Sequence, residues 1–512
     1  MRSAQVKGFT IVELIVVIVV IGILTALVVV GYNGIQLRSR TAIVQASVEQ
    51  TGKQLDLYKT DNNGQYPETL TNLPNGDYEN GEVTYEYTPN NSADPPTYCL
   101  TVTLGTVSYM YTPTTTAVEG VCSGHLGSNE ALSPSYYAVL TATSGNSNCY
   151  INSGAAYCWG TGSYGQIGDG NTSSSSVPVA VDTTGVLAGK TVTSIDKGSS
   201  HACVSASGAA YCWGYNSSGQ LGDGTQTARY TPVAVDVSGV MAGKNIIQVA
   251  TGANHSCALD DQGAAYCWGE GQYGKLGSGL GGNALSPVAV ATSGVLAGKT
   301  LTQIAAGGFH TCGIDSEGVA YCWGYNSNGQ LGDNSTTIRS TPVAVNTDGA
   351  LSGKTVSFIA TGHQATCAVA DGESFCWGNN SNGVIGSGST ATTVNTPTAT
   401  STSGVLSGKT VTSVSVGSTS TCAVADGKAY CWGINSSSGQ LGNNSTAVGY
   451  SPVAVDDSDV LNGKTIVAVS ASGVACALSD EPHLYCWGSG SSGKLGNGGT
   501  ANSLVPVAVV GM

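Results

Sequence analysis

Charged side chains are scarce in this 512-residue chain, in which Asp, Glu, Lys and Arg together make up 10% of the residues. Only 18 residues are Lys or Arg against 32 Asp or Glu, so the formal net charge is −14 at pH 7. Nucleic-acid binding needs clustered Lys and Arg to neutralise phosphates. The composition therefore argues against nucleic acid as a partner, while the length allows two or more domains.

Recurring catalytic and metal-binding patterns are also missing. A histidine recurs at one position of the sequence repeats described below, in His201, His255 and His310, but His363 is shifted and Ser420 and Val474 replace it elsewhere. Three of seven equivalent loops keep an aspartate, namely Asp169, Asp223 and Asp333. No nucleophile–base set or carboxylate pair recurs. We therefore expect a structural role for the histidines, no metal or calcium site, no cofactor and no enzymatic activity.

What the chain does contain is a strict repeat. Each of its seven tryptophans stands in the tripeptide Cys-Trp-Gly, 54 or 55 residues from the next: Trp159, Trp213, Trp268, Trp323, Trp377, Trp432 and Trp487. Such a period predicts one supersecondary unit copied around an axis. Each unit holds four short alternating runs, typified by PVAV, TLTQIA, TCGI and AYCW, bounded by Gly, Asn, Asp or Ser. Four antiparallel strands at this period predict the blade of a β-propeller.

The ends of the repeat region suggest how the ring closes. A PVAV-type run occurs seven times, and the last copy, from Pro506 to Val509, lies at the C-terminus. The first unit, from Tyr136, has no such run before it and begins at AVLTAT. We therefore expect an all-β, seven-bladed propeller over residues 136–512, in which the C-terminal strand closes the first blade and removes edge strands. A solenoid is the alternative.

The repeat phrases resemble those of the regulator of chromosome condensation family of seven-bladed propellers. The matching elements are G-x-x-H-[ST]-C, as in GANHSC, and N-x-x-G-Q-L-G-D, as in NSSGQLGD. They also resemble bacterial relatives, including a propeller-type β-lactamase inhibitor. The resemblance implies the fold of residues 136–512 but no particular function, because this fold hosts unrelated binding roles.

The number and spacing of the cysteines indicate the cellular compartment of the folded chain. Fourteen of the 16 cysteines form one local pair per unit, each flanking a hairpin turn: Cys149 with Cys158, Cys203 with Cys212, Cys257 with Cys267, Cys312 with Cys322, Cys367 with Cys376, Cys422 with Cys431, and Cys476 with Cys486. Directly opposed residues of antiparallel strands lie within disulfide reach. The remaining two, Cys99 and Cys122, would close a loop nearer the N-terminus. A regular, even set indicates disulfides formed outside the cytosol, with buried thiols or a metal site as the alternatives.

The N-terminus combines a short basic segment, residues 1–8, with an apolar run that has no charged residue from Leu14 to Val30. The run is close to the ~20 residues that span a bilayer. An ordinary signal peptide is disfavoured because Gly8, the cleavage-like residue, precedes the apolar run. A plain anchor leaves Glu13 unexplained, because a carboxylate in an apolar helix costs about 2.5–3.5 kcal/mol on insertion.

The phrase KGFTIVEL, followed by the apolar run, resembles the class III leader of type IV pilins and type II secretion pseudopilins. The resemblance implies that a prepilin peptidase cuts between Gly8 and Phe9 and methylates the new amino terminus. It also implies that Glu13 pairs with the amino terminus of a neighbouring subunit, an ion pair that would offset the burial cost only in a filament.

The helix that starts at the leader is expected to span residues 9–62, with a transmembrane and assembly segment at 9–31 and a stop at Asp61-Asn-Asn-Gly64. Alternating runs between residues 78 and 122 predict a small antiparallel sheet. Residues 63–122 would then complete a pilin-like α+β domain. Residues 123–135 are interpreted as a linker to the propeller.

Strand alternation sorts the propeller loops onto two faces. The GVLAGK loops and hairpin turns share one face, where six lysines should form a rim neutralised by acidic turns: Lys190, Lys244, Lys299, Lys354, Lys409 and Lys464. The G-x-x-H turns and the long, variable loops from CWG to PV share the other face. Binding residues concentrate on loops held by a rigid scaffold. The candidates for ligand contact are therefore Arg229, Tyr230, Ile338, Arg339 and Tyr450.

These observations predict a surface protein without enzymatic activity. It would be held in the cytoplasmic membrane before assembly and then displayed on an extracellular pilus, with other pilin subunits as partners. A propeller about 50 Å across exceeds the 8–10 Å spacing of packed helices, so we expect a low-copy or tip subunit that binds an extracellular protein or glycan. The alternatives are a type II secretion pseudopilin that recognises secreted substrate, and a surface-borne enzyme inhibitor or enzyme.

Overall fold

The computed structural model describes residues 147–401, 404–481 and 483–511, four strands between residues 84 and 119, and some positions between residues 51 and 67. The chain divides into two compact units, Met1–Ser133 and Pro134–Met512, which are described separately. Gly8, Phe9, Glu13, Cys122 and the linker at 123–135 lie outside the described residues. So does the helix predicted over residues 9–62, apart from helical positions between residues 51 and 60.

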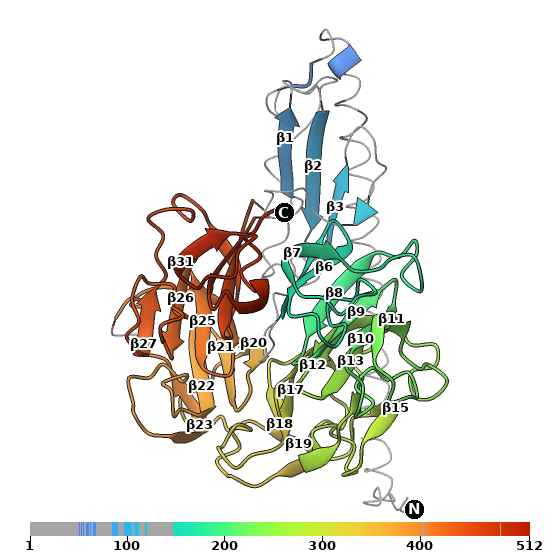
Figure 1. Cartoon of the computed structure of the whole chain (residues 1–512), viewed down its shortest axis with the longest axis vertical. Helices are drawn as coiled ribbons and strands as arrows, with labels where there is room; N and C mark the ends of the chain where they lie inside the picture. The colour runs from blue at the N-terminus through green and yellow to red at the C-terminus, as the bar shows by residue number, and fades with distance from the viewer. Residues whose placement is uncertain are drawn as a thin grey trace, which may run out of the picture. The chain divides into compact units, whose positions relative to one another are not determined.

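The N-terminal unit contains the expected small antiparallel sheet. Its strands are β1 (Thr84–Asn90), β2 (Thr97–Leu104), β3 (Val107–Tyr111) and β4 (Val118–Glu119), paired in the order β1-β2-β3-β4 (Figure 1). The register places Tyr87 opposite Leu100, which is fully buried. Among the described residues, no helix has the length and apolar character that a membrane crossing requires.

One predicted disulfide of this unit stays a prediction. Cys99 lies in β2, opposite Thr88 of β1. Its expected partner, Cys122, lies beyond the end of β4 and outside the described residues.

The second unit is a ring of seven blades, each an antiparallel sheet formed by consecutive strands (Figure 1). Blade 1 contains β5 (Ser147–Asn152), β6 (Ala155–Gly160) and β7 (Ser175–Ala180). Blades 2 to 4 contain β8 (Val192–Lys197), β9 (His201–Ala206), β10 (Ala209–Gly214), β11 (Arg229–Ala234); β12 (Ile246–Thr251), β13 (His255–Asp260), β14 (Ala265–Gly269), β15 (Ala284–Ala289); and β16 (Leu301–Ala306), β17 (His310–Asp315), β18 (Ala320–Gly324), β19 (Arg339–Ala344).

Blades 5 to 7 repeat the pattern with β20 (Val356–Thr361), β21 (Ala365–Ala370), β22 (Glu373–Asn379), β23 (Thr393–Ala399); β24 (Val411–Val416), β25 (Ser420–Ala425), β26 (Lys428–Gly433), β27 (Gly449–Ala454); and β28 (Ile466–Ser470), β29 (Val474–Ser479), β30 (Leu484–Gly488), β31 (Ser503–Ala508). Two 3-10 turns, η2 (Gln272–Gly274) and η3 (Ser491–Gly493), lie in the loops of blades 3 and 7. The first strands of consecutive blades contact one another, which places them at the inner side of the ring.

The predicted closure of the ring is wrong. The last strand, β31, pairs with β30 of its own unit, with Tyr485 opposite Ala508 and Cys486 opposite Val507. The six remaining strands with a PVAV-type run likewise each pair with the CWG strand immediately before them. The reason is local, because the loop after CWG returns the chain to the free edge of the strand it has just left. Consecutive elements thus complete each blade, and the AVLTAT run lies outside the described residues.

Side chains, rather than an exchanged strand, join the last blade to the first. Trp159 Nε1 of blade 1 and Asn148 Nδ2 donate to the carbonyl of Lys494 in blade 7, at 2.9 and 2.8 Å. The backbone N–H of Gly498 donates to the carbonyl of Ser176 at 2.9 Å. A hydrophobic cluster that includes Trp159 and Leu484 fills the same interface. The ring is therefore continuous around all seven blades.

Each tryptophan joins its blade to the preceding blade, and we call this contact the tryptophan lock. All seven are fully buried, and each indole N–H donates to a carbonyl of the preceding blade at 2.8–3.1 Å. The glycine two residues beyond that carbonyl packs against the ring. At Gly277, where φ is +70°, an added Cβ would lie 2.6 Å from Trp323 Nε1. Only glycine fits this position, because it has no Cβ and tolerates positive φ.

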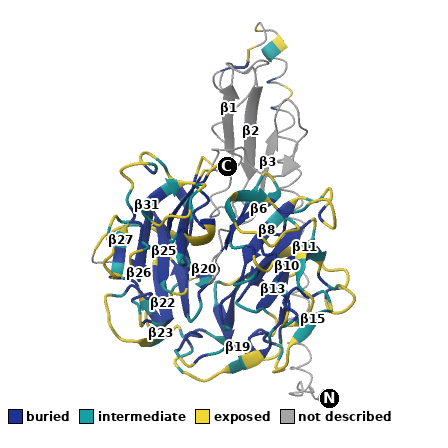
Figure 2. Cartoon of the chain, viewed as in Figure 1, coloured by how far each residue is buried: buried dark blue, intermediate teal, exposed yellow. Residues whose placement is uncertain are grey.

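Disulfides clip the hairpin of each blade, as the sequence predicts. Each bond joins directly opposed residues of the two strands that flank the hairpin turn, with Cα–Cα distances of 4.0–4.1 Å. All fourteen cysteines are fully buried, as Figure 2 shows for the strands that carry them. The bonds are Cys149 with Cys158, Cys203 with Cys212, Cys257 with Cys267, Cys312 with Cys322, Cys367 with Cys376, Cys422 with Cys431, and Cys476 with Cys486.

The turns of these hairpins explain why the cysteines oppose one another. Several turns contain two residues with positive φ, such as Ser207 and Gly208. Such turns suit the twist of paired strands and fix their register. In blade 2 the register places Cys203 directly opposite Cys212, so the bond forms without displacing either strand.

Candidate ligand-binding face

The two predicted faces of the propeller are confirmed by their hydrogen bonds. The hairpin turn at Gly208 accepts a backbone hydrogen bond from Ile246, which follows a GVLAGK-type loop, so these elements share one face. The N–H of Tyr215, which follows CWG, donates to the carbonyl of Ser200 in a G-x-x-H turn. We call the first face the lysine face and the second the G-x-x-H face.

On the lysine face, nearby carboxylates neutralise most of the lysine charges, as expected. Lys244 pairs with Asp260 at 3.4 Å, Lys354 with Glu373 at 3.4 Å and Lys409 with Asp426 at 3.6 Å. Lys299 and Lys464 also contact carboxylates, and Lys190 lies over the ring of Tyr211. A cavity of about 230 Å³ opens here beside Lys409, Lys428 and Lys464. Because Asp457 lines it and pairs with Lys428, an anion would compete with an internal carboxylate.

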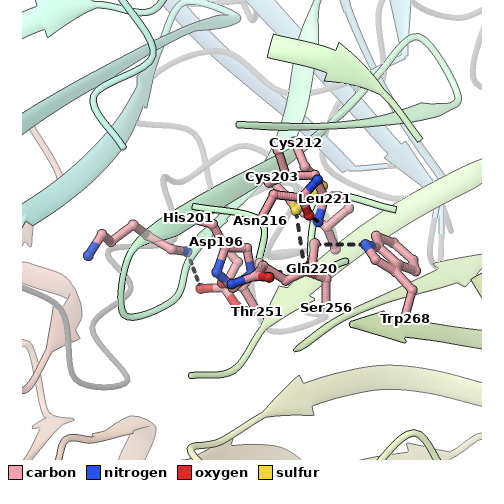
Figure 3. The surroundings of a disulfide bond; sticks show 12 residues. Asp196, His201, Cys203, Cys212, Asn216, Gln220, Leu221, Thr251, Ser256 and Trp268 are labelled. Carbon is pink, nitrogen blue, oxygen red and sulfur yellow. Dashed lines mark hydrogen bonds between the residues drawn. A yellow bond between two sulfur atoms is a disulfide. The ribbon is translucent and has the colours of Figure 1, made fainter. Parts of the chain in front are cut away.

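The three histidines of the G-x-x-H turns have structural partners. His201 Nε2 lies 2.9 Å from Ser256 Oγ in the next blade, and that hydroxyl donates to the carbonyl of Gln220 at 2.8 Å (Figure 3). Since the single hydroxyl hydrogen is used there, His201 is the donor. Trp268 Nε1 donates to the same carbonyl at 2.9 Å. The network therefore couples His201 to the tryptophan lock.

The same arrangement recurs in the next two blades. His255 Nε2 lies 2.9 Å from Thr311 Oγ1 and His310 Nε2 lies 2.7 Å from Thr366 Oγ1. Burial lowers the pKa of His201 and His310 to about 3, so both imidazoles are neutral at physiological pH. Within the described part of the chain, no group of three or more His, Cys, Asp or Glu side chains could hold a metal ion.

Two arginines among the ligand candidates are bound within their own loops. Arg229 Nε and Nη2 donate to Asp223 Oδ2 at 2.9 and 2.8 Å, and Arg339 makes the equivalent pair with Asp333. Burial alone would raise the pKa of Asp223, but hydrogen bonds from Thr225 and Arg229 outweigh it and lower the value. The Asp and Arg occur together in blades 2 and 4, a co-occurrence that could have revealed the pairing from the sequence.

The ligand candidates are not gathered into one site. Tyr230, Ile338 and Tyr450 are 47%, 44% and 40% exposed, at or next to the start of the fourth strand in blades 2, 4 and 6. Tyr230 packs against Gly165 and Tyr450 against Gly383, each in the preceding blade. They lie on the G-x-x-H face, as predicted, but in blades that are not adjacent.

The structure instead brings together four rings, none of which the sequence predicts as a ligand contact. Tyr273 and Tyr325 lie 4.8 Å apart between centroids, Phe309 lies 5.9 Å from Tyr325, and His363 lies 4.8 Å from Phe309. They belong to loops of blades 3, 4 and 5 on the G-x-x-H face, and each is half-buried. We call these residues the aromatic patch. The sequence does contain a signal for this patch. The residue after CWG is aromatic in some units, as at Tyr215 and Tyr325, and not in others, as at Ser489.

A charged pair and two amide contacts border the aromatic patch. Lys275, fully buried, lies 5.5 Å from the centre of the Phe309 ring and bonds to Glu270. Burial lowers the pKa of Lys275, while the ion pair opposes that shift. Asn254 Nδ2 donates to Glu270 at 3.4 Å on one side, and Asn379 Nδ2 donates to Gln364 at 3.2 Å on the other.

These features define a seven-bladed β-propeller with a disulfide in every blade. One face carries lysines paired with carboxylates, and the other carries the aromatic patch. The RCC1-like domain family matches residues 129–476, and the regulator of chromosome condensation (RCC1) repeat matches residues 483–512. The chain therefore belongs to the family of proteins with an RCC1-like domain. The prokaryotic N-terminal methylation motif matches residues 4–29, in agreement with the prepilin-type leader inferred from KGFTIVEL.

Relatives with curated names share the propeller. The ultraviolet-B receptor UVR8 of Arabidopsis thaliana is 28% identical over 387 residues, which cover 74% of this chain and 83% of the receptor. The E3 ubiquitin-protein ligase HERC2 of Homo sapiens is 30% identical over 268 residues, which cover 51% of this chain but only 5% of the ligase.

Solved structures agree on the fold. Human WBSCR16 superposes with a TM-score of 0.61 at 22% identity, covering 70% of this chain and 94% of that one. Yeast RCC1 (Prp20), solved bound to Kap60, has a TM-score of 0.59 at 21% identity, with coverages of 74% and 86%. At such identities the similarity establishes the propeller and nothing about its ligand.

Proposed function

We propose that this protein is a type IV pilin-like filament subunit, present in few copies or at the tip, whose propeller binds an extracellular ligand in attachment. The observation that carries the proposal is the presence, in one chain, of a prokaryotic N-terminal methylation motif and a propeller with a disulfide in every blade. The motif implies processing by a prepilin peptidase at the cytoplasmic membrane. Disulfides persist outside the cytosol, which fits export.

The size of the propeller supports a low copy number. A compact body of the length of Pro134–Met512 is about 50 Å across. Helices in a filament core pack about 8–10 Å apart, so a propeller on every subunit would crowd its neighbours. A subunit at the tip, or one used sparingly, avoids that conflict.

Binding without catalysis is the activity we propose for the propeller. Its G-x-x-H face carries the aromatic patch near the inner turns and the candidates Arg229, Tyr230, Ile338, Arg339 and Tyr450 at the strand ends. His201, His255 and His310 are engaged between blades, and the six lysines of the lysine face pair with carboxylates or rings. Aromatic side chains on a rigid scaffold are typical of recognition surfaces.

The proposal is tested first at the N-terminus. Mass spectrometry of the mature chain should find N-methylphenylalanine, from Phe9, at the amino terminus. Glu13→Gln should leave cleavage intact but keep the chain out of filaments, because it removes the charge that would pair with a neighbouring terminus. Glu119→Gln, in the small sheet, is the charge-matched control and should assemble normally. A mature chain that begins elsewhere, or Glu13→Gln chains that enter filaments normally, would refute the filament role.

The cellular test separates a pilus subunit from a secretion pseudopilin. Deletion of the gene should abolish attachment and leave both the filaments and protein export unchanged, and antibodies to the propeller should label filament ends. Blocked export with normal attachment would favour the pseudopilin. Dense labelling along the filament would overturn the proposed low copy number.

A further inference from the structure

The rings of the aromatic patch lie at angles that leave each partly open to solvent. Tyr273 and Tyr325 are inclined by 52°, Phe309 and Tyr325 by 63°, and Phe309 and His363 by 72°. None of the four is fully buried, although each packs against another ring. Half-buried rings in fixed positions lose little side-chain entropy on binding, which suits them for holding a ligand.

The electrostatics of the patch indicate a neutral ligand. Lys275 beneath Phe309 is fully buried and bonded to Glu270, so the two charges compensate one another. Burial lowers the pKa of His363, which keeps its ring neutral at physiological pH. Phosphate and carboxylate ligands are held by exposed, unpaired cations, and the described residues around these rings offer none.

Polar groups that suit hydroxyls flank the rings on both sides. The Glu270 carboxylate with the Asn254 amide lies on the blade 3 side, and the amides of Gln364 and Asn379 lie on the blade 5 side. All four are half-buried, which limits their motion. A ligand that matches must present apolar C–H surface to the rings and hydroxyls at its edges, and sugar rings have this combination.

A second aromatic pair repeats part of this arrangement at another blade boundary. Tyr164 and Tyr215 lie 5.0 Å apart at the blade 1–2 boundary, and Tyr164 is 49% exposed. They occupy the same loop positions that Tyr273 and Tyr325 occupy at the blade 3–4 boundary. In blades 6 and 7 the residue after CWG is Ile434 or Ser489, so this aromatic pair is not repeated there.

We propose that the G-x-x-H face binds a neutral oligosaccharide, whose sugar rings stack on Tyr273, Phe309 and Tyr325 and whose hydroxyls bond to Glu270, Gln364 and Asn379. This inference deepens the proposed function and rests on the propeller being the ligand-binding part of the filament subunit. A protein partner is less suited, because a stable protein interface buries about 800 Å² on each side. The four half-buried rings of the aromatic patch offer less apolar surface than such an interface needs.

The test uses the full-length mature chain in a detergent without sugar headgroups, applied to an array of neutral and anionic oligosaccharides. We expect retention on neutral glycans that persists in 1 M salt (about 3 Å Debye length), because the ligand itself carries no charge for the salt to screen. For the best array glycan, titration calorimetry should show at least tenfold weaker binding for Tyr325→Ala and for Tyr273→Ala. Tyr325→Phe, which keeps the ring, should bind within about threefold of the native chain.

Leu280→Ala is the matched control, since Leu280 is an apolar side chain, 67% exposed, on the same loop of blade 3 as Tyr273 but outside the aromatic patch. It should leave glycan affinity unchanged. Thermal midpoints of all variants identify any that misfold, and Gln364→Ala, which removes a neutral amide beside the patch, provides a second probe with the rings intact. Its expected result is weaker binding without loss of the fold.

Three results would overturn the glycan assignment: no neutral glycan retained, retention of anionic glycans only with loss in salt, or neutral-glycan affinity unaffected by Tyr273→Ala and Tyr325→Ala. If the tyrosine variants lose attachment to cells while no glycan is bound, the ligand is a protein and the adhesive function stands. If a strain lacking the chain attaches normally, the proposed function fails whatever the array shows.

Discussion

The tryptophan locks and the aromatic patch use similar side chains for opposite purposes. Every blade has the same buried indole, donating to a carbonyl of its neighbour at 2.8–3.1 Å. The aromatic patch, in contrast, draws Tyr273, Phe309, Tyr325 and His363 from only three blades and leaves them partly exposed. In a repeat protein, a feature present in every copy serves the shared fold, whereas a feature confined to some copies is free to serve recognition.

The difference also separates the two kinds of substitution that would damage the protein. A change in a lock should affect stability wherever it is made, since each blade depends on its neighbours. A change in the aromatic patch should affect ligand affinity and leave the unfolding free energy nearly constant. All seven tryptophans lie in the propeller, so tryptophan fluorescence of the full chain reports on the unfolding of that unit.

The largest effect is expected from Trp323→Ala. The indole is fully buried and its N–H bonds to the Lys275 carbonyl at 3.0 Å, so the substitution leaves a cavity and removes one of the two hydrogen bonds to that carbonyl, the other coming from Thr311 Oγ1. Large-to-small core changes of this kind cost about 3–5 kcal/mol in unfolding free energy. Denaturant unfolding followed by fluorescence measures the change, with Leu280→Ala as the exposed control. A loss below about 1 kcal/mol would show that the locks do not hold the ring together.

A somewhat smaller effect is expected from removing one disulfide with the double substitution Cys312→Ala and Cys322→Ala. The bond closes a loop with a sequence separation of 10, and loop-closure entropy assigns such a loop about 2.5 kcal/mol. The variant should unfold at a lower denaturant concentration, and the same deficit should appear for the pair in any other blade. Strong dependence on which blade is changed would mean that the units are less equivalent than their repeat suggests.

The smallest effect concerns pH and one histidine. His310 has a folded pKa of about 3 because of burial, against an ordinary value of 6.5. Between these values the unfolded chain binds the extra proton, so stability is present above pH 6.5 and is lost as the pH falls towards 3. The slope is about 1.4 kcal/mol per pH unit for one group.

His310→Gln removes this proton uptake while keeping an N–H that can reach Thr366. The difference in unfolding free energy between the native chain and the variant should therefore shrink as the pH is lowered from 7 to 5. Chemical denaturation at several pH values measures it, and the acidic groups common to both chains cancel in the comparison. A difference that stays constant with pH would mean that His310 is protonated in the folded ring.

Local features of the propeller were predictable because they depend on neighbours in the sequence. The bond between Cys203 and Cys212 follows from a short hairpin, in which opposed residues are fixed by the turn. The burial of the tryptophans followed from their identical repetition. The prediction of the ring closure was wrong because a PVAV-type run can pair at either end of a unit. Strand alternation alone does not say which edge of the sheet is free. The sequence predicts Arg229 as an exposed ligand contact, whereas in the structure its hydrogen bonds to Asp223 hold it within its own loop.

By itself the sequence determined the number of blades, the disulfide in each hairpin and the prepilin-type leader, because each is written in short phrases whose geometry is local. Only the tertiary structure decided that the last strand completes its own blade and that Trp159 joins the ends of the ring through Lys494. It alone placed Tyr273, Phe309, Tyr325 and His363 together, since residues from successive repeats become neighbours only when the blades pack around their common axis.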